Sequence, residues 1–315
     1  MKTLRIAFMG TPRFALPSLQ LLLDRAEHIV AVITQPDRPA GRGQHIVPPP
    51  VKECALRHGL AVLQPLNVRD ADFIAQVKKL APDLIVVVAF GQILPRTLLD
   101  IPRYGCVNVH ASLLPFYRGA APINWVLING ETETGVTIML LDEGMDTGDI
   151  LLQEKLSIAP TDTVATLHDR LAHSGALLLG KALDQLVSTG WSPKPQDHAH
   201  ATYAPLLKKE DGVILWHKSA REIYNQIRGM NPWPGCFTYL QGKLLKVFAA
   251  EIGESEAQGT PGTIVEVSQS GITVATGSGM LVLKEIQLEG KKRMPAEEFI
   301  KGKNIQCGDV LTATK

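Results

Sequence analysis

Cysteine is scarce in this sequence: only four of its 315 residues are cysteines, and they lie far apart in the chain. No two of them have the short spacing of a zinc-binding pair, so no structural metal site is expected. Scattered, unpaired cysteines are typical of a reducing compartment, and we therefore expect a cytoplasmic protein. Cys106 lies beside candidate polar residues, but a small buried strand residue is a simpler interpretation than a nucleophile.

Long apolar runs are also absent. The longest, Leu84–Phe90, is far too short to cross a bilayer. The first residues, Met1–Gly10, lack the length and the small-residue cleavage site of a signal peptide, and they read better as a first strand. No membrane association is therefore expected.

An excess of charge of either sign is likewise missing. The chain has 32 Lys and Arg against 31 Asp and Glu, which gives a formal net charge of +1. Residues 1–205 hold 18 basic and 19 acidic side chains, and residues 206–315 hold 14 and 12. Charge totals do not suggest a nucleic-acid partner, so any RNA contacts must be local.

Short apolar runs alternate with helical patterns through the first half of the chain. Strands are predicted at residues 4–9, 29–34, 61–64, 84–90 and 105–109, and helices at 16–23, 51–58, 71–80 and 123–129. This alternation predicts an α/β fold with a doubly wound, mostly parallel sheet of Rossmann-like type. A hairpin-like pair at 134–141 and 150–156 follows, and then a long helix that ends near Thr189.

The length of the chain favours two domains. The segment from Gly190 is rich in proline and polar residues, which is typical of a linker. We therefore place a catalytic domain at 1–189, a linker at 190–207 and a second domain at 208–315. In the second domain, one helix precedes short strands separated by turns, at 237–240, 244–249, 262–267, 271–275 and 280–283. That pattern predicts a small β-barrel.

A polar pair, Asn108 and His110, closes the predicted strand 105–109. Their spacing places both side chains on one face of the strand. In open parallel sheets, ligands bind beyond the carboxyl ends of the strands, and this pair falls there. Three aspartates on the later turn, Asp142, Asp146 and Asp149, are candidate partners, and the residues alone do not choose among them. An amide, an imidazole and a carboxylate together predict acyl transfer without a metal or a covalent intermediate.

The segment Gln35–Pro50 holds five prolines, two glycines and two arginines among its 16 residues. A flexible surface insertion is the simpler interpretation. Arginine between glycines has another use, because a guanidinium there can reach phosphates or base edges. Arg42 is the main candidate for such a contact, with Arg38 in support.

These residues belong to a wider resemblance. Four segments resemble the formyltransferases that use 10-formyltetrahydrofolate, namely Phe90-Gly-Gln-Ile-Leu-Pro95, Asn108-Val-His-Ala-Ser-Leu-Leu-Pro115, Tyr117-Arg-Gly-Ala-Ala-Pro122 and Gly144-Met-Asp-Thr-Gly148. Gln35–Gly43 and Asn231-Pro-Trp-Pro-Gly235 narrow the match to the members that formylate methionyl-tRNA. The resemblance extends from Gly10-Thr-Pro12 to Gly290-Lys-Lys-Arg-Met294, over nearly the whole chain.

The resemblance implies roles for particular residues. It selects Asp146 as the third catalytic residue beside Asn108 and His110, and it implies that the C-terminal barrel is OB-like and binds tRNA. The implied folate contacts are Phe90, Gly91, Ile93, Leu94, Ser112, Leu113, Leu114 and Pro115. The implied tRNA contacts are Arg42, Arg38, Lys291, Lys292 and Arg293.

The resemblance also implies a reaction. The formyl group of 10-formyltetrahydrofolate, a co-substrate rather than a tightly bound cofactor, would pass to the α-amino group of methionine on initiator tRNA, in a monomeric enzyme. Relatives usually carry a basic residue where this chain has Phe116, and Arg118 is the candidate substitute. The turn anchor Trp233 is expected to be buried.

Rival functions make different predictions. A formyltransferase that acts on a sugar-nucleotide amine or another small amine would share the three catalytic residues, and the Arg42 segment argues for tRNA. A nicotinamide oxidoreductase requires a three-glycine loop that this chain lacks. A non-catalytic RNA-binding module would need a strongly basic barrel, which residues 206–315 do not provide.

Overall fold

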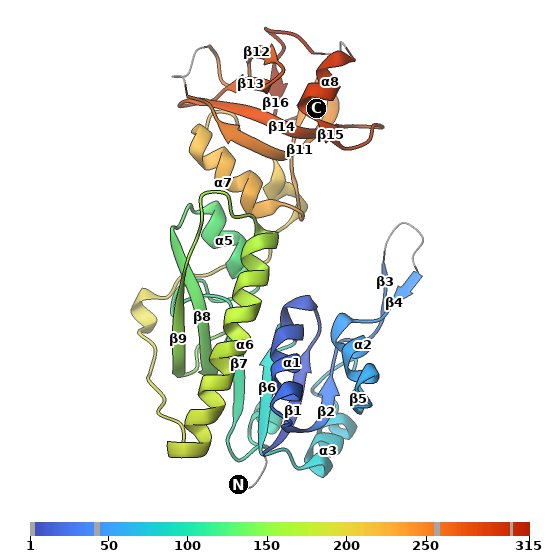
Figure 1. Cartoon of the computed structure of the whole chain (residues 1–315), viewed down its shortest axis with the longest axis vertical. Coiled ribbons are helices and arrows are strands. Elements are labelled where there is room, and N and C mark those ends of the chain that lie inside the picture. Colours follow the sequence, from blue (N-terminus) through green and yellow to red (C-terminus); the bar gives the residue numbers. More distant parts are fainter. Residues whose placement is uncertain (1–3, 41–44, 255–258, 303–304) are drawn as a thin grey trace. The chain divides into compact units, whose positions relative to one another are not determined.

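The computed structural model describes residues 4–40, 45–254, 259–302 and 305–315, and it forms two compact units (Figure 1). The first unit comprises Met1–Pro122, Glu133–Ser157 and His168–Ala204. The second comprises Ile123–Thr132, Ile158–Leu167 and Pro205–Lys315. Two short segments that interrupt the sequence of the first unit thus join the second unit. The division into a catalytic domain at 1–189, a linker at 190–207 and a second domain at 208–315 stays a prediction from the sequence.

A seven-stranded sheet forms the centre of the first unit, with the strand order β5-β2-β1-β6-β7-β8-β9 (Figure 1). Its strands are β1 Arg5–Gly10, β2 His28–Ile33, β5 Val62–Leu63, β6 Leu84–Val88, β7 Cys106–His110, β8 Glu133–Leu140 and β9 Ile150–Ser157. The first five strands of this order pair in parallel, and β8 and β9 pair antiparallel. The predicted mostly parallel, doubly wound sheet and the hairpin-like pair are confirmed.

Burial explains how the strands are arranged. All five residues of β6 are buried, as expected for an apolar strand at the centre of the sheet. From Leu152 to Ser157 of the edge strand β9, partly buried positions alternate with exposed ones, because successive side chains point to opposite faces of the sheet. The helices of this unit are η1 Arg13–Ala15, α1 Leu16–Asp24, α2 Pro50–Arg57, α3 Ala71–Leu80, α4 Arg96–Leu99 and η2 His198–His200. α3 begins after Asp70, whose side chain accepts a hydrogen bond from the amide of Asp72.

The long helix α6, Val164–Thr189, packs against the strand that carries Asn108 and His110. The contact is close because Gly175 has no side chain. A Cβ atom at Gly175 would lie 2.7 Å from Cγ1 of Val109 and 3.4 Å from Cγ1 of Val136. The side chain of Val109, which lies between Asn108 and His110 on β7, therefore packs directly against this helix.

The segment predicted as a linker is held against the first unit over much of its length. The indole nitrogen of Trp191 donates to the carbonyl of Tyr104 at 2.8 Å. Lys194 exchanges backbone hydrogen bonds with Ile150 at 2.8 and 2.9 Å. This segment is thus anchored at several points, although its composition is typical of a flexible connection.

The second unit is built on a curled antiparallel sheet with the strand order β12-β13-β14-β11-β10-β16, and β15 pairs with β14. Its strands are β10 Cys236–Leu240, β11 Lys243–Ile252, β12 Ile264–Ser268, β13 Gly271–Ala275, β14 Met280–Leu288, β15 Met294–Pro295 and β16 Leu311–Thr312. Its helices are α5 Pro122–Ile128, η3 Lys209–Gly212, α7 Ala220–Met230 and α8 Ala296–Lys301. The fold of this unit confirms the predicted OB-like barrel.

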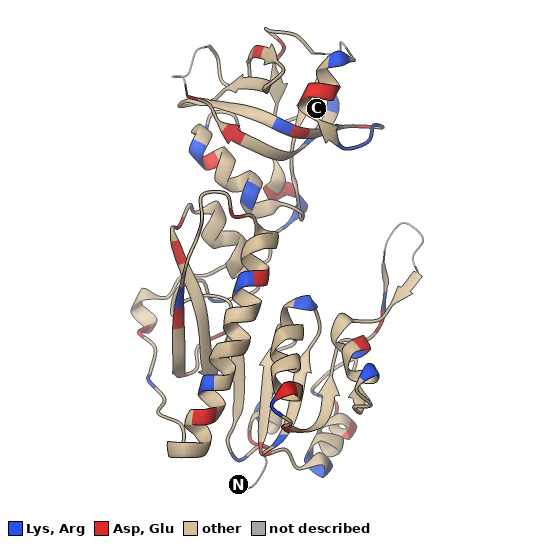
Figure 2. Cartoon of the chain, viewed as in Figure 1, with Lys and Arg blue, Asp and Glu red and all other residues tan. Residues whose placement is uncertain are grey.

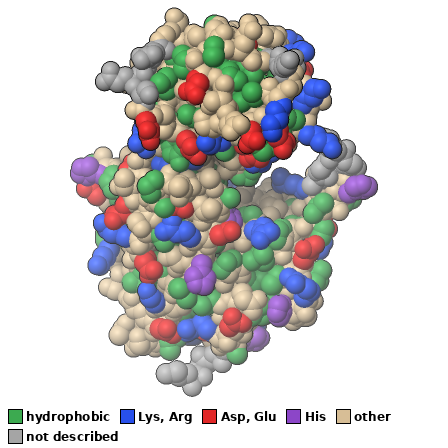
Figure 3. All heavy atoms as spheres, turned by 45° about the horizontal axis from the view of Figure 1, so that its top comes forward, with side chains coloured by type: hydrophobic (Ala, Val, Ile, Leu, Met, Phe, Trp, Pro, Cys, Tyr) green, Lys and Arg blue, Asp and Glu red, His purple; other side chains and the backbone are tan. Residues whose placement is uncertain are grey.

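Charged side chains of both signs are interspersed along both units (Figure 2), and the face drawn in Figure 3 shows the same mixture. This arrangement agrees with the near-neutral total. Within the part of the chain that the structure describes, no helix has both the length and the apolar character needed to cross a membrane.

Candidate functional site

Asn108 and His110 occupy alternate positions of β7, so both side chains leave the same face of the sheet. Asn108 lies beside Val87 of β6 and Met139 of β8 in the strand register. Its side chain is partly exposed and forms no hydrogen bond with another residue among those described. The amide is therefore available to a ligand beyond the carboxyl ends of β6 and β7.

The two ring nitrogens of His110 face different partners. Nε2 lies 3.0 Å from the carbonyl oxygen of Tyr117. A carbonyl only accepts hydrogen bonds, so Nε2 carries a proton in this arrangement. Nδ1, which holds the lone pair of the neutral ring, lies 3.6 Å from Oδ1 of Asp146. The histidine is 6% exposed, so both contacts are largely shielded from water.

Asp146 reaches His110 from a turn that begins at the other end of β7. The amide of Leu141 donates to the carbonyl of Cys106, the first residue of the strand, at 2.8 Å. The loop then folds back, and Asp146 adopts a left-handed backbone with φ of 54°. Its Oδ2 accepts a hydrogen bond from the amide of Gly119 at 2.8 Å. One carboxylate oxygen is thus fixed, and the other faces the imidazole.

Asp142 has a different role, which separates the candidate carboxylates. Its Oδ1 accepts hydrogen bonds from the amide of Gly144 at 3.0 Å and from the hydroxyl of Thr147 at 2.6 Å. Both contacts lie within the turn itself, as is typical of an aspartate that stabilises its own loop. Asp146 is the one whose carboxylate faces His110, with Oδ1 3.6 Å from Nδ1.

Thr11 joins three loops at the carboxyl edge of the sheet. Its hydroxyl donates to the carbonyl of Phe90 at 3.2 Å and accepts from the amide of Gln35 at 3.2 Å. The preceding Gly10 must lack a side chain, because a Cβ atom there would lie 2.8 Å from Cβ of Ala15 and 3.0 Å from the carbonyl of Val88. The ends of β1, β2 and β6 are therefore held together beside Asn108.

The loop after β7 is stabilised by two polar residues that the sequence patterns did not single out. The hydroxyl of Thr137 donates to the carbonyl of Ser112 at 2.7 Å and accepts from the amide of Leu114 at 3.1 Å. The side chain of Gln153 donates to the carbonyl of Leu114 at 2.9 Å. Both residues lie on strands, where a threonine or glutamine gives no distinctive signal.

The predicted folate contacts fall into two groups. Phe90, Leu94, Ser112 and Leu114 are buried, and the hydroxyl of Ser112 donates to the carbonyl of Phe116 at 2.6 Å. These residues shape the two loops from within. Gly91, Ile93, Leu113 and Pro115 keep partly or fully exposed surface on the same loops. Gly91 has a φ of 89°, a conformation that favours glycine.

Burial decides the interpretation of two further residues, Cys106 and Arg118. Cys106 is 1% exposed, and desolvation raises the pKa of its thiol to about 12, so it is the expected buried strand residue and not a nucleophile. Arg118 is 2% exposed and donates to Gln196 and His198. The hypothesis that Arg118 substitutes for the basic residue that relatives carry at position 116 is therefore wrong, because its guanidinium is buried and already engaged. Phe116 itself is 46% exposed.

Two short strands of the proline-rich insertion pair as a hairpin. β3, Arg38–Ala40, pairs antiparallel with β4, His45–Val47. Arg38 is exposed, and its guanidinium donates to Oε1 of Gln35 at 3.2 Å. At the base of the hairpin, hydrogen bonds from Gln64 and then Lys52 lower the pKa of Asp37. Arg42 lies outside the described residues.

In the second unit, the predicted basic cluster lies on the turn between β14 and β15. Lys291 and Lys292 are exposed. Arg293 pairs with Glu285, and its guanidinium carbon lies 4.2 Å from the ring centroid of Phe248. The expectation that Trp233 is buried was wrong, because its side chain is 56% exposed.

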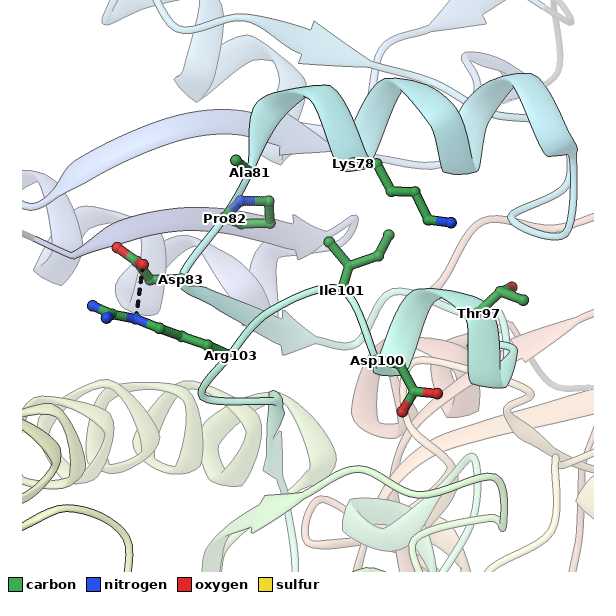
Figure 4. Close-up of a pocket in the computed structure, with 8 residues that line it drawn as sticks. All are labelled: Lys78, Ala81, Pro82, Asp83, Thr97, Asp100, Ile101 and Arg103. Carbon is green, nitrogen blue, oxygen red and sulfur yellow. Dashed lines mark ion pairs between the residues drawn. The ribbon is translucent and has the colours of Figure 1, made fainter.

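A shallow cavity lies at the amino edge of the first sheet (Figure 4). It is lined by Lys78, Ala81, Pro82, Asp83, Thr97, Asp100, Ile101 and Arg103. Arg103 pairs with Asp83 at 2.9 Å, and Asp100 pairs with Arg96 at 2.9 Å. Since ligands of such sheets bind at the opposite, carboxyl edge, this cavity is not the candidate site.

Comparisons with known proteins bear on both units. The family model of the formyl transferases matches residues 4–183, and the model of the formyl transferase C-terminal domain matches residues 206–304. The chain is 55% identical to a methionyl-tRNA formyltransferase of Geotalea uraniireducens over 311 residues, covering 99% of both chains. It is 56% identical to a methionyl-tRNA formyltransferase of Trichlorobacter lovleyi over 307 residues, covering 98% of this chain and 96% of the relative.

Solved structures share the fold at lower identity. The sugar 3N-formyl transferase WlaRD superposes with a TM-score of 0.67 at 19% identity, covering 93% of this chain and 100% of that one. HypX from Aquifex aeolicus in complex with tetrahydrofolic acid has a TM-score of 0.63 at 17% identity, covering 95% of this chain and 47% of that one.

Proposed function

Because this chain belongs to the methionyl-tRNA formyltransferase family, we propose that Asn108, His110 and Asp146 carry its chemistry. The enzyme transfers the formyl group of 10-formyltetrahydrofolate to the α-amino group of methionine on initiator tRNA, and the product serves translation initiation. The observation that supports the three residues most directly is their convergence. Nδ1 of His110 and Oδ1 of Asp146 lie 3.6 Å apart, and the Asn108 amide on the same face of β7 forms no hydrogen bond with another described residue.

The attacking amine needs little activation. A model α-amino group titrates near ~7.7–8.0, and the ester link to the tRNA lowers this pKa further, so the neutral amine is available near neutral pH. Its nitrogen forms a bond to the formyl carbon, and the formyl oxygen gains negative charge. The Asn108 side chain donates a hydrogen bond to that oxygen, which stabilises the tetrahedral species.

Proton transfer follows from the orientation of His110. Its lone pair is on Nδ1, so the proton that leaves the amine is received there, directly or through water. The resulting imidazolium is stabilised by Asp146 on the same side. At 3.6 Å, Nδ1 and Oδ1 are too far apart for a direct hydrogen bond, and one bridging water molecule or a small closure joins them. The proton then passes to N10 of the folate as the bond from N10 to the formyl carbon breaks, which releases tetrahydrofolate.

The substrates are proposed to meet at the carboxyl edge of the first sheet. The folate lies along the loops that contain residues 90–94 and 112–115, where Gly91, Ile93, Leu113 and Pro115 offer accessible surface. The tRNA is contacted by Arg38 of the β3–β4 hairpin, by Arg42, and by the basic turn at 291–293. We further propose that the enzyme is a monomer in the cytoplasm, where its tRNA substrate is charged.

Acceptor competition tests this function. The purified chain is incubated with formyl-labelled 10-formyltetrahydrofolate and either methionyl initiator tRNA, glycinamide ribonucleotide or an amino-sugar nucleotide. We expect label in the methionyl-tRNA alone, because the proposed contacts from the hairpin and the second unit can be made by a tRNA and not by a small amine. Faster transfer to the amino-sugar nucleotide would instead establish the alternative acceptor.

A further inference from the structure

Gln196 stands out in the segment that follows α6. Its neighbours Pro195 and Asp197 are exposed, whereas Gln196 is 6% exposed. Its side-chain nitrogen donates to the carbonyl of Asp146 at 2.9 Å and to the carbonyl of Gly148 at 2.7 Å. One buried amide thus binds two backbone carbonyls of the turn that carries the proposed catalytic carboxylate.

The other end of Gln196 is fixed by a buried cation. Its Oε1 accepts hydrogen bonds from Nε and one terminal nitrogen of Arg118, at 3.2 and 2.6 Å. Among the described residues, no carboxylate pairs with this guanidinium. A buried charge needs polar partners, so Gln196 also stabilises Arg118.

These contacts close a ring around Asp146. Gly119, the residue after Arg118, donates its amide to Oδ2 of Asp146 at 2.8 Å. The carbonyl of Asp146 accepts from Gln196, and Gln196 accepts from Arg118. The backbone and the carboxylate of Asp146 are therefore anchored to the same short segment, which matters because a left-handed backbone at a non-glycine residue must be held by its surroundings.

We propose that Gln196 is a positioning residue for the reaction: through its two hydrogen bonds to the turn, it holds Asp146 so that Oδ1 faces Nδ1 of His110. This inference rests on the proposed role of Asp146. The competing interpretation is that Gln196 only fastens the segment after α6 to the first unit. The two interpretations predict different losses of kcat when Gln196 is replaced in a variant that already lacks the Asp146 carboxylate.

The substitution Gln196→Glu separates the two ends of the side chain. A glutamate keeps the length and the acceptor for Arg118, but it has no N–H for the carbonyls of Asp146 and Gly148. We expect kcat to fall by about 10- to 100-fold, the penalty typical of a misplaced catalytic group. The KM values for both substrates should change less than about threefold, because Gln196 contacts neither substrate in the proposed mechanism.

The decisive measurement is a double-mutant cycle with Asp146→Asn. Asparagine also tolerates the left-handed backbone, so this variant removes the charge and preserves the turn. If Gln196 acts through Asp146, Gln196→Glu should cost less than about threefold in the Asp146→Asn background. An equal loss in both backgrounds would overturn the inference and leave the proposed function intact. Normal activity of Asp146→Asn alone would instead overturn the proposed role of Asp146.

Trp191→Phe provides the matched control, because it removes another side-chain hydrogen bond that anchors the same segment. It should lower the melting temperature with less than about a twofold change in kcat. A comparable loss of kcat in this control would mean that anchoring alone accounts for the effect. Gln196→Met, which loses both ends of the contact, is the second variant, and failure of both variants to fold would show that the residue is structural.

Discussion

At the scale of single residues, Asn108 allows catalysis to be separated from stability. Its side chain has no hydrogen bond within the described protein, so Asn108→Ala should leave the free energy of unfolding nearly unchanged. The same substitution should lower kcat/KM by about 10²- to 10³-fold, as is usual when an oxyanion donor is removed. Steady-state formylation and urea unfolding of the same preparation test both expectations.

His110→Ala should lose at least as much activity but behave differently in unfolding. It removes the hydrogen bond to the carbonyl of Tyr117, so stability should fall by about 0.5–1.5 kcal/mol. Cys106→Ala is the control, since it alters the same strand without touching the proposed chemistry. Activity near that of the unsubstituted enzyme is expected for Cys106→Ala, whereas near-normal turnover in both Asn108→Ala and His110→Ala would rule the assignment out.

The sequence predicts part of the site for clear physical reasons. The alternation of side chains on a strand places Asn108 and His110 together without any knowledge of the rest of the chain. The choice of Asp146 needed the family resemblance, because its loop leaves the sheet beside Cys106 and only the folded path returns it to His110. Gln196 gives no signal at all, since the prolines and polar residues around it are typical of exposed chain.

At the scale of elements, the contact between α6 and β7 is expected to be intolerant of added volume. Gly175→Ala places a methyl group 2.7 Å from Cγ1 of Val109, a stiff side chain between Asn108 and His110. We expect a loss of about 1–3 kcal/mol in the free energy of unfolding. We also expect a lower kcat, because the strand that carries both residues must shift.

Gly180→Ala on the same helix is the control. A Cβ atom at Gly180 would lie 3.5 Å from Cδ2 of Leu21, which is an ordinary contact. Replacing a helical glycine with alanine without a clash should raise stability by about 0.5–1 kcal/mol. Thermal unfolding of the two variants tests this expectation. Equal shifts of the two melting temperatures would mean that helix propensity, and not the close approach of Gly175 to Val109, determines the change in stability.

The elements themselves were predictable where local signals agree. The predicted helix 71–80 is found at those bounds, with the Asp70 cap before it and a left-handed residue, Ala81, after it. The β3–β4 hairpin was not predicted, because Pro39 within β3 and the prolines that follow β4 obscure the pattern of an extended ladder. Helix α8 was missed as well, since its six residues are too few to show a helical period.

At the scale of the whole molecule, a formal charge of +1 means that affinity for a polyanion depends on a few local cations. Lys291→Ala with Lys292→Ala should raise the KM for methionyl-tRNA and leave the KM for the folate unchanged. Each lysine that contacts a phosphate should also lower the slope of log affinity against log salt by about 1. Initial rates at several salt concentrations give both quantities.

Lys301→Ala is the matched control, because it removes one exposed cation of the same unit from helix α8, where it pairs with Glu297. It should change neither the KM for tRNA nor its salt dependence. Arg293→Ala should have a smaller effect than the lysine pair, since its guanidinium is already engaged by Glu285 and Phe248. A salt slope unaffected by the lysine substitutions would contradict the proposed role of this turn.

The two hydrogen bonds from Gln196 to the turn that carries Asp146 have a consequence for the order in which the protein is synthesised. Translation proceeds from the amino end, so a growing chain acquires its asparagine, imidazole and carboxylate well before the glutamine, which follows Asp146 by 50 positions. A nascent chain that has just passed α6 therefore contains every reacting side chain but lacks the amide that fastens the last of them.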